Sequence, residues 1–140
     1  MVSVVIYFKS DKALKHLLKH GVVYTIRKEK RKRVGKDWIT TGRGNKKIAD
    51  VNVEYVGMVE ILYKGFGNWF GGVVFPDNKP KFMYDATLED YVKHSGFNTV
   101  NAWIRELMRL NGIKTWKKMP IEWHLYKVTL VKKAEEERDG

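Results

Sequence analysis

The chain has 140 residues, of which 44% are hydrophobic, so we expect one domain with an ordinary core. A formal net charge of +11 and an isoelectric point near 9.8 favour nucleic acid or an anionic surface as the partner. The absence of cysteine excludes disulfides and thiolate zinc sites. No apolar run approaches the ~18 residues of a membrane span and no basic region precedes the first one, so we expect no signal peptide, no membrane contact and a cytoplasmic location.

The first half of the chain predicts strands around one helix. Alternating apolar residues predict a strand over residues 2–8. Ser10 or Asp11 caps a helix that ends at Gly21, and a β-branched run predicts a strand over 22–27. The segments that follow are a loop or exposed edge at 28–33, a short strand at 38–41, a turn at 42–45 and a strand at 48–59 with a bend near Gly57.

The second half predicts helices followed by a last strand. Residues 64–81 form either a hairpin or an irregular aromatic loop. Thr87 to Asp90 has the spacing of a capping box and predicts a helix that ends at Gly96. A further helix begins near Thr99 and ends at Gly112. A strand over 123–130 and a charged, frayed tail over 134–140 complete the chain.

This order of elements predicts a mixed α+β fold with a small, mostly antiparallel sheet or barrel. No repeat or linker divides the chain. We therefore expect a single domain over residues 1–132 and a C-terminal tail over 133–140.

Positive charge is concentrated between Arg27 and Lys47. The basic residues there are Arg27, Lys28, Lys30, Arg31, Lys32, Arg33, Lys36, Arg43, Lys46 and Lys47. With only Glu29 and Asp37 against them, this stretch carries +8 of the +11. Such a local field predicts phosphate contacts with nucleic acid. The alternative is a solvated loop of a thermophile surface, although such surfaces usually interleave acids.

The aromatic residues have two interpretations. Phe66, Trp69 and Phe70 lie among glycines, where they could stack on bases. The alternative is packing in the core, which is the more common fate of aromatic side chains. Trp38 and Trp103 are predicted core residues, the latter from its helical spacing.

Motifs for metals and cofactors are weak. His16 and His20 are four residues apart, a spacing that can bind metal on a helix, but no third ligand is evident. The glycines near Phe66 match neither phosphate-loop spacing. We therefore expect no metal and no cofactor.

Several short motifs occur together along the chain. They are Leu17-Leu18-Lys19-His20-Gly21 with Thr25-Ile26-Arg27, Gly35-Lys36-Asp37, Lys46 to Val51, Thr87 to Phe97 with Thr99, and Trp123 to Val128. Together they resemble the ASCH domains of the PUA-like superfamily, over most of the chain outside residues 60–82 and the tail.

The resemblance implies a PUA-like, mostly antiparallel β-barrel of five or six strands with about three flanking helices. It implies a cleft formed by Thr25, Arg27 and Ser95, with RNA or a modified nucleoside as the ligand. Some members hydrolyse an acylated cytidine with a Lys, a Thr and a Glu. Thr25 matches the Thr, whereas Val22 and Ser95 stand at the Lys and Glu positions.

Three functions remain open. The first is nucleic-acid binding, with RNA favoured, through the basic rim and the cleft near Thr25 and Arg27. The second is a small hydrolase acting on a modified nucleoside or on RNA. Thr25 would then be the catalytic hydroxyl and Asp85, Glu89 or Asp90 would replace the lost acid, but a Thr needs a nearby base, so the sequence favours a protein that is not an enzyme. The third is a protein-interaction module that uses the aromatic segment, and the oligomeric state is left open.

Overall fold

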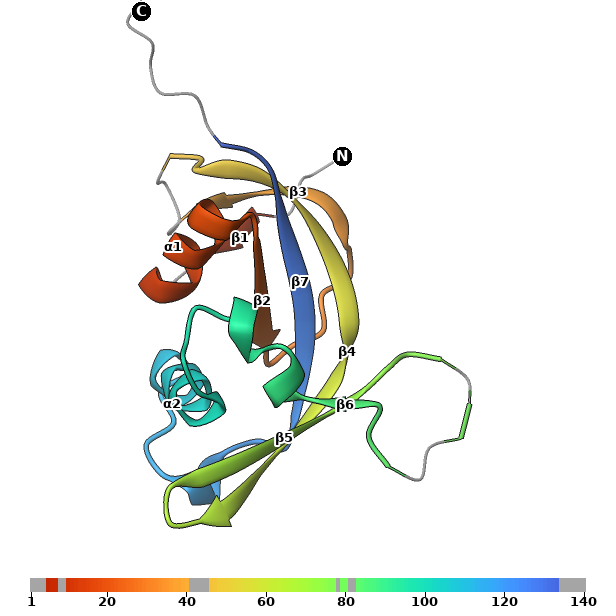
Figure 1. Ribbon diagram of the computed structural model, residues 1–140, viewed down its shortest axis with the longest axis vertical. Coiled ribbons are helices and arrows are strands. Elements are labelled where there is room, and N and C mark those ends of the chain that lie inside the picture. The colour runs from red at the N-terminus through yellow and green to blue at the C-terminus, as the bar shows by residue number, and fades with distance from the viewer. Residues whose placement is uncertain (1–4, 8–9, 41–45, 78, 81–82, 134–140) are drawn as a thin grey trace, which may run out of the picture.

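The computed structural model describes residues 5–7, 10–40, 46–77, 79–80 and 83–133. Within them the chain forms one seven-stranded sheet (Figure 1). Its strands are β1 (Val5–Tyr7), β2 (Val22–Arg27), β3 (Gly35–Thr40), β4 (Ala49–Gly65), β5 (Asn68–Val74), β6 (Ala86–Thr87) and β7 (Glu122–Lys133). The α-helices are α1 (Asp11–His20) and α2 (Val100–Leu110), and the 3-10 helices are η1 (Leu88–Asp90), η2 (Val92–His94) and η3 (Trp116–Lys118). A mixed α+β class with a mostly antiparallel sheet is confirmed.

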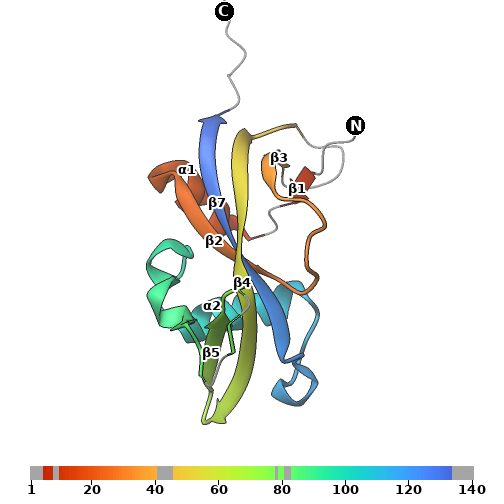
Figure 2. The same ribbon diagram turned by 90° about the vertical axis from the view of Figure 1, so that its right-hand side faces the viewer.

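The long strand β4 organises the sheet (Figure 2). β7 runs antiparallel along one edge of β4, and β2 lies outside β7. On the other edge of β4, β3 pairs with its first part and β5 with its last part. β1 adds to β3 in parallel, and β6 adds to β5. The pair β4–β7 therefore joins both halves of the fold.

The sheet is open among the described residues, unlike the closed barrel that the family resemblance implies. Closure would need β1 to pair with β2, and neither strand has such a partner in the described part of the chain. The helix α1 connects these two strands and packs against β2 and β7. It occupies the side on which the two edges would meet (Figure 1).

One extra residue in β4 turns its side chains over. The register between β4 and β7 shifts between Tyr55 and Gly57, so odd-numbered residues change faces across the shift. Val53 belongs to a core cluster with α1, whereas Val59 belongs to a second cluster with α2. The bend expected near Gly57 coincides with this bulge, which lets one strand contribute to two cores.

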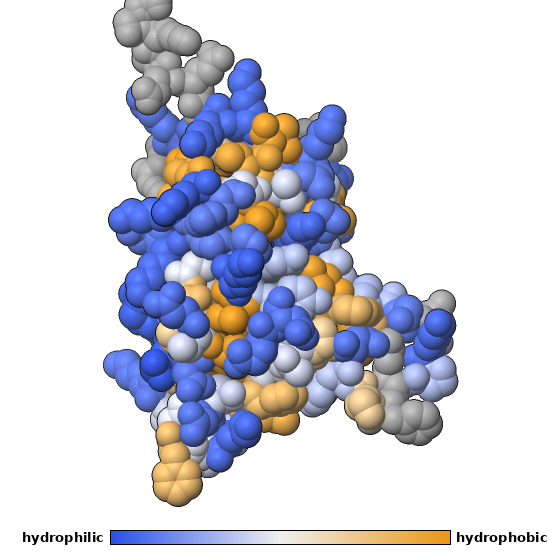
Figure 3. Space-filling model, in the orientation of Figure 1, coloured by the Kyte–Doolittle hydropathy of each residue, from blue (hydrophilic) through white to orange (hydrophobic). Residues whose placement is uncertain are grey.

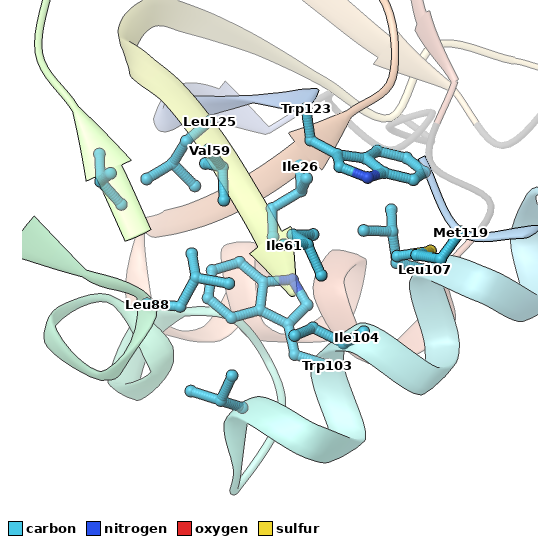
Figure 4. Close-up of a cluster of buried hydrophobic side chains, with 12 residues drawn as sticks. Ile26, Val59, Ile61, Leu88, Trp103, Ile104, Leu107, Met119, Trp123 and Leu125 are labelled. Atoms are coloured by element: carbon cyan, nitrogen blue, oxygen red, sulfur yellow. The ribbon is translucent and has the colours of Figure 1, made fainter. Parts of the chain in front are cut away.

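The two helices pack on separate clusters. The cluster of α1 contains Ala13, Leu14, Leu17, Val23, Ile39, Ala49, Val51, Val53, Tyr126 and Val128. In the cluster of α2, Trp103 and Ile104 point toward Ile61 of β4 and Leu88 of η1 (Figure 4). Trp103 is buried as expected, whereas Trp38 is only half-buried.

Local capping explains where the α-helices begin. The Ser10 hydroxyl accepts a hydrogen bond from the Ala13 N–H at 3.3 Å, and the Thr99 hydroxyl accepts one from the Ala102 N–H at 3.1 Å. Gly21 ends α1 with φ of 82°, a conformation that favours glycine. These boundaries agree with the sequence-based prediction.

Two predictions for the middle of the chain need adjustment. The expected helix from Thr87 to Gly96 is two 3-10 turns, although the capping box around η1 is present. Gly96 follows these turns with φ of 93° and lies close to α1, where a Cβ on it would come within 2.7 Å of the Lys12 carbonyl oxygen. Of the two alternatives for residues 64–81, a hairpin forms: β4 extends to Gly65 and β5 begins at Asn68. The expected turn at 42–45 and the tail at 134–140 lie outside the described residues.

Candidate nucleic-acid interface

The segment 28–34, here called the basic loop, connects β2 to β3. Lys28, Lys30, Lys32 and Arg33 within it are exposed, and so is Lys36 at the start of β3. The prediction of a loop at 28–33 is therefore confirmed, and the loop presents several cations to solvent.

Arg31 of the basic loop is held by contacts with β3 and β7. Its guanidinium contacts Asp37 at 2.6 Å, and the two side chains are only 16% and 5% exposed. Its backbone N–H donates to the hydroxyl of Tyr126 at 2.6 Å. Asp37 in turn accepts from the backbone N–H of Trp38 at 2.8 Å. The contacts of Arg31 therefore fix the loop against β3 and β7.

A cluster of Tyr55, His124 and Tyr126 lies next to the basic loop and holds a second loop residue. The ammonium of Lys30 lies 4.8 Å from the ring centre of Tyr55, which is a cation–π distance. The Tyr55 hydroxyl is 2.8 Å from Nδ1 of His124, and the rings of Tyr55 and Tyr126 are 5.2 Å apart. Register places Arg27 opposite His124 on the same face of the sheet. Sequence reasoning missed this cluster because only the pairing of distant strands assembles it.

Burial controls the ionisation of these groups. Burial lowers the pKa of His124, with a further lowering from Lys30 and opposing effects from Glu122 and Glu29. Burial also raises the pKa of the Tyr55 hydroxyl. Burial, reinforced by Arg31, lowers the pKa of Arg27 to about 10. Arg27 therefore stays charged at neutral pH, whereas His124 favours its neutral form.

The structure divides the basic stretch into two locations. Lys46 and Lys47 precede β4, at the end of the β3–β4 pair where Ile39 faces Ala49, whereas the basic loop precedes Gly35 at the other end. Six residues of β3 span about 20 Å. Lys47 also forms an exposed ion pair with Asp50 at 3.0 Å. Arg43 lies outside the described residues.

The expected cleft of Thr25, Arg27 and Ser95 is not assembled as one site. Thr25 and Arg27 share a face of β2, and Thr25 is 8% exposed. Ser95 is fully buried, donates to the Val92 carbonyl at 2.8 Å and accepts from the Phe97 N–H at 3.0 Å.

The segment that carries Ser95 packs against the other face of β2. Tyr91 of that segment contacts the ring of Tyr24, with ring centres 4.8 Å apart, and Tyr24 alternates with Thr25 along the strand. Two of the acids considered as substitutes serve local turns, because Asp85 accepts from the Phe75 N–H and Asp90 from the Thr87 N–H.

The three predicted stacking residues differ in their environments. Phe66 is 101% exposed at the tip of the β4–β5 hairpin. Trp69 is half-buried and contacts Tyr63 with ring centres 4.9 Å apart. Phe70 is half-buried against Tyr84 at 5.4 Å. Only Phe66 is presented to solvent as a free ring face.

Three of the four histidines, His16, His20 and His94, lie together. Nε2 of His16 is 3.0 Å from Nδ1 of His94, and the ring of His20 lies 4.4 Å from that of His16. Among the described residues, no group of three or more His, Asp or Glu side chains is arranged to hold a metal ion. Nor does the described part of the chain contain a helix that is long and apolar enough to cross a membrane.

Comparison with known proteins adds no family assignment. No protein-family model matches the chain, and neither curated proteins nor solved structures give a match.

Proposed function

We propose that this chain binds nucleic acid, with RNA favoured over DNA, through the exposed cations of the basic loop and Lys36. The observation that carries the proposal is that some cations within residues 28–36 anchor the loop while others are exposed to solvent. Lys30 and Arg31 hold the loop against Tyr55, Asp37 and Tyr126. The remaining cations, Lys28, Lys32, Arg33 and Lys36, are exposed.

A fixed loop favours phosphate binding for a physical reason. Ordering a flexible segment on association costs free energy, and a loop that is already anchored avoids part of this cost. Lysine and arginine side chains on such a loop contact phosphates without reading the bases. The expected result is binding that tolerates many sequences and weakens with salt.

The preference for RNA and for a nucleoside-sized site comes from the resemblance to ASCH domains, which we propose as the relationship of this chain. Selectivity would then be supplied by the face of β2 that carries Thr25 and Arg27. The charged state of Arg27 at neutral pH suits a phosphate or a base carbonyl.

Salt-dependent binding tests the proposal. Fluorescence anisotropy would measure the affinity for a labelled RNA hairpin between 50 and 300 mM salt, for the wild type and for the triple variant Lys28→Ala, Lys32→Ala and Lys36→Ala. If each lysine contacts one phosphate, the triple variant should flatten the slope of log affinity against log salt by about 2–3.

A matched control keeps the same change in net charge. The triple variant Lys19→Ala, Lys79→Ala and Lys93→Ala removes three exposed lysines from other segments. It should retain the wild-type slope. Equal losses in both triple variants, or no binding by the wild type at 50 mM salt, would exclude the basic loop as the interface.

A hydrolase acting on an acylated nucleoside is the second candidate, and one observation favours it. His124 shares a face with Thr25, because Thr25 pairs with Tyr126 and His124 is two residues before Tyr126 on β7. The lowered pKa of His124 makes it a neutral base at pH 7. Incubation with N4-acetylcytidine should release cytidine in the wild type and not in His124→Gln, and no release by the wild type would exclude this activity.

A further inference from the structure

The tip of the β4–β5 hairpin exposes the ring of Phe66, whose backbone adopts an unfavourable positive φ angle. Gly65 pairs with Asn68, so Phe66 and Gly67 form a two-residue turn in which both φ angles are positive, 54° and 77°. Such turns favour Asn, Asp or Gly at the first position, and a phenylalanine there is strained. Figure 3 shows an apolar side chain projecting at the lower end of the molecule, where this hairpin lies.

The hairpin turn that carries Phe66 is held by an aromatic cluster centred on Tyr63. The Tyr63 hydroxyl accepts a hydrogen bond from the Gly67 N–H at 2.8 Å and so fixes the turn. Tyr63 also packs between two tryptophans. Its ring centre is 4.9 Å from that of Trp69 and 4.9 Å from that of Trp116, and the ring of Trp116 is nearly parallel to it at 20°. Trp116 remains 49% exposed, so one side of this stack is open.

The two segments that build this aromatic tip carry lysines and no acids. The two segments that build it, 61–76 and 110–121, contain Lys64, Lys114, Lys117 and Lys118 and no Asp or Glu. All four lysines are exposed, and the ammonium of Lys117 lies 5.9 Å from the ring centre of Trp116. Residues outside 27–47 carry a formal net charge of only +3. The two segments carry +4, so the remaining residues outside 27–47 are close to neutral.

We propose that Phe66 and Trp116, with Tyr63 packed behind Trp116, form a stacking platform for unpaired bases of a single-stranded nucleic acid, and that the lysines of the two segments bind its phosphates. Open ring faces beside cations match the recognition of single strands, in which bases stack and the backbone follows positive charge. A duplex hides its base faces and cannot use this platform. The absence of acids makes a basic protein segment a poor partner.

The inference rests on the proposed binding of nucleic acid and adds a second contact far from the first. Lys30 of the basic loop contacts Tyr55, and Gly65 lies ten positions after Tyr55 along β4. Ten strand residues span about 30 Å. A single strand that reaches from the basic loop to the tip would therefore contact phosphates at one end and stack its bases at the other.

Affinity for a labelled 15-nucleotide oligouridine, measured by anisotropy, tests the platform. Phe66→Asn removes the ring and places a favoured residue in the turn, so the variant should fold at least as well as the wild type. Each ring contributes about 5- to 150-fold to the affinity, from about 1–3 kcal/mol per stacked base. Phe66→Asn and Trp116→Ala should each lose an amount in that range, while Phe66→Tyr and Trp116→Phe, which keep a ring, should restore binding.

Phe75→Ala is the control, because Phe75 is 37% exposed and follows the end of β5 that is remote from the hairpin turn. Its affinity should equal that of the wild type. Photo-crosslinking with 5-iodouridine in the same oligomer should yield adducts on peptides that contain Phe66 or Trp116. Unchanged affinity in both tip variants, or adducts confined to the basic loop, would overturn the platform and leave the proposed function standing.

The opposite failure is also distinguishable. If the tip variants lose affinity while the triple variant of the basic loop does not, the platform is supported and the proposed interface at the basic loop is excluded. If sedimentation shows a dimer that Trp116→Ala dissociates, and oligouridine affinity is unchanged by that substitution, the tip is a contact between copies of this chain and the platform is overturned.

Discussion

Replacing Arg31 with alanine should destabilise the protein, whereas replacing the adjacent Lys32 should not. The two residues are equivalent in the sequence, both being cations in the same run. In the structure, Arg31 contacts Asp37 at 2.6 Å with both side chains largely buried, while Lys32 is exposed. The pair therefore separates an anchoring charge from a solvated one.

The magnitude follows from what the substitution leaves behind. Removing one partner of a buried ion pair costs about 3–5 kcal/mol, because the other charge remains buried without compensation. The side chain of Arg31 is still 16% exposed, and Asp37 keeps the N–H of Trp38 as a donor. We therefore expect a loss nearer about 2–3 kcal/mol for Arg31→Ala, which corresponds to roughly 8 °C in Tm for a domain of this size. Exposed Lys32→Ala should stay within about 0.5 kcal/mol.

Urea unfolding of the two variants measures the difference directly. A double-mutant cycle with Asp37→Asn should give a coupling energy of about 1–3 kcal/mol between Arg31 and Asp37. If Arg31→Ala and Lys32→Ala were equally stable, the ion pair would not anchor the loop. The assignment of Lys28, Lys32, Arg33 and Lys36 as the binding cations would then lose its structural basis.

Three further outcomes are expected. Gly57→Ala should lower the free energy of unfolding, measured with urea, by at least about 2 kcal/mol, because its Cβ would lie 2.3 Å from the Val74 carbonyl oxygen. An unchanged free energy of unfolding would contradict the close approach of β4 and β5 at this position. Because folding lowers the pKa of His16 and of His124 below the usual value of about 6.5, the unfolded chain binds more protons than the folded chain just below that pH. Stability should therefore be full above that pH and fall on acidification through it, and a flat urea midpoint between pH 7.5 and 5 would refute this. Thr25→Val should weaken the binding of a selectively recognised nucleoside, measured by competition, by about 1–3 kcal/mol and leave the affinity for an oligonucleotide unchanged. Equal losses for both ligands would mean that Thr25 serves only the structure of the sheet.

Helix boundaries were predictable because their causes are local. Ser10 and Thr99 cap residues three positions ahead, and the left-handed Gly21 closes α1 by donating its backbone N–H to the Leu17 carbonyl of the same helix. A hydrogen bond within one turn depends only on neighbouring residues. The same locality explains why the capping box at Thr87 formed, whereas the sequence did not predict that the segment would fold as two 3-10 turns with Gly96 close to α1.

The sequence indicated the basic stretch of the candidate site, but it could not show which of its cations anchor the loop and which are exposed. Counting charge identified the stretch from Arg27 to Lys47, because composition is independent of folding. Counting could not separate Arg31, which binds Asp37 and a hydroxyl 95 residues away, from Lys32 beside it. It also could not separate the loop from Lys46 and Lys47 at the other end of β3.

By itself, the sequence determined the mixed α+β class, the two capped helices and the concentration of positive charge. Tertiary structure alone decided which side chains meet: the bulge near Gly57 assigns the two parts of β4 to different cores, and strand register brings Tyr55 to His124. It also decided that Phe66 is exposed while Trp69 and Phe70 are half-buried. The physical reason is that residues distant in sequence meet only through register and packing, whereas caps, periodicity and charge depend on nearby residues or on none.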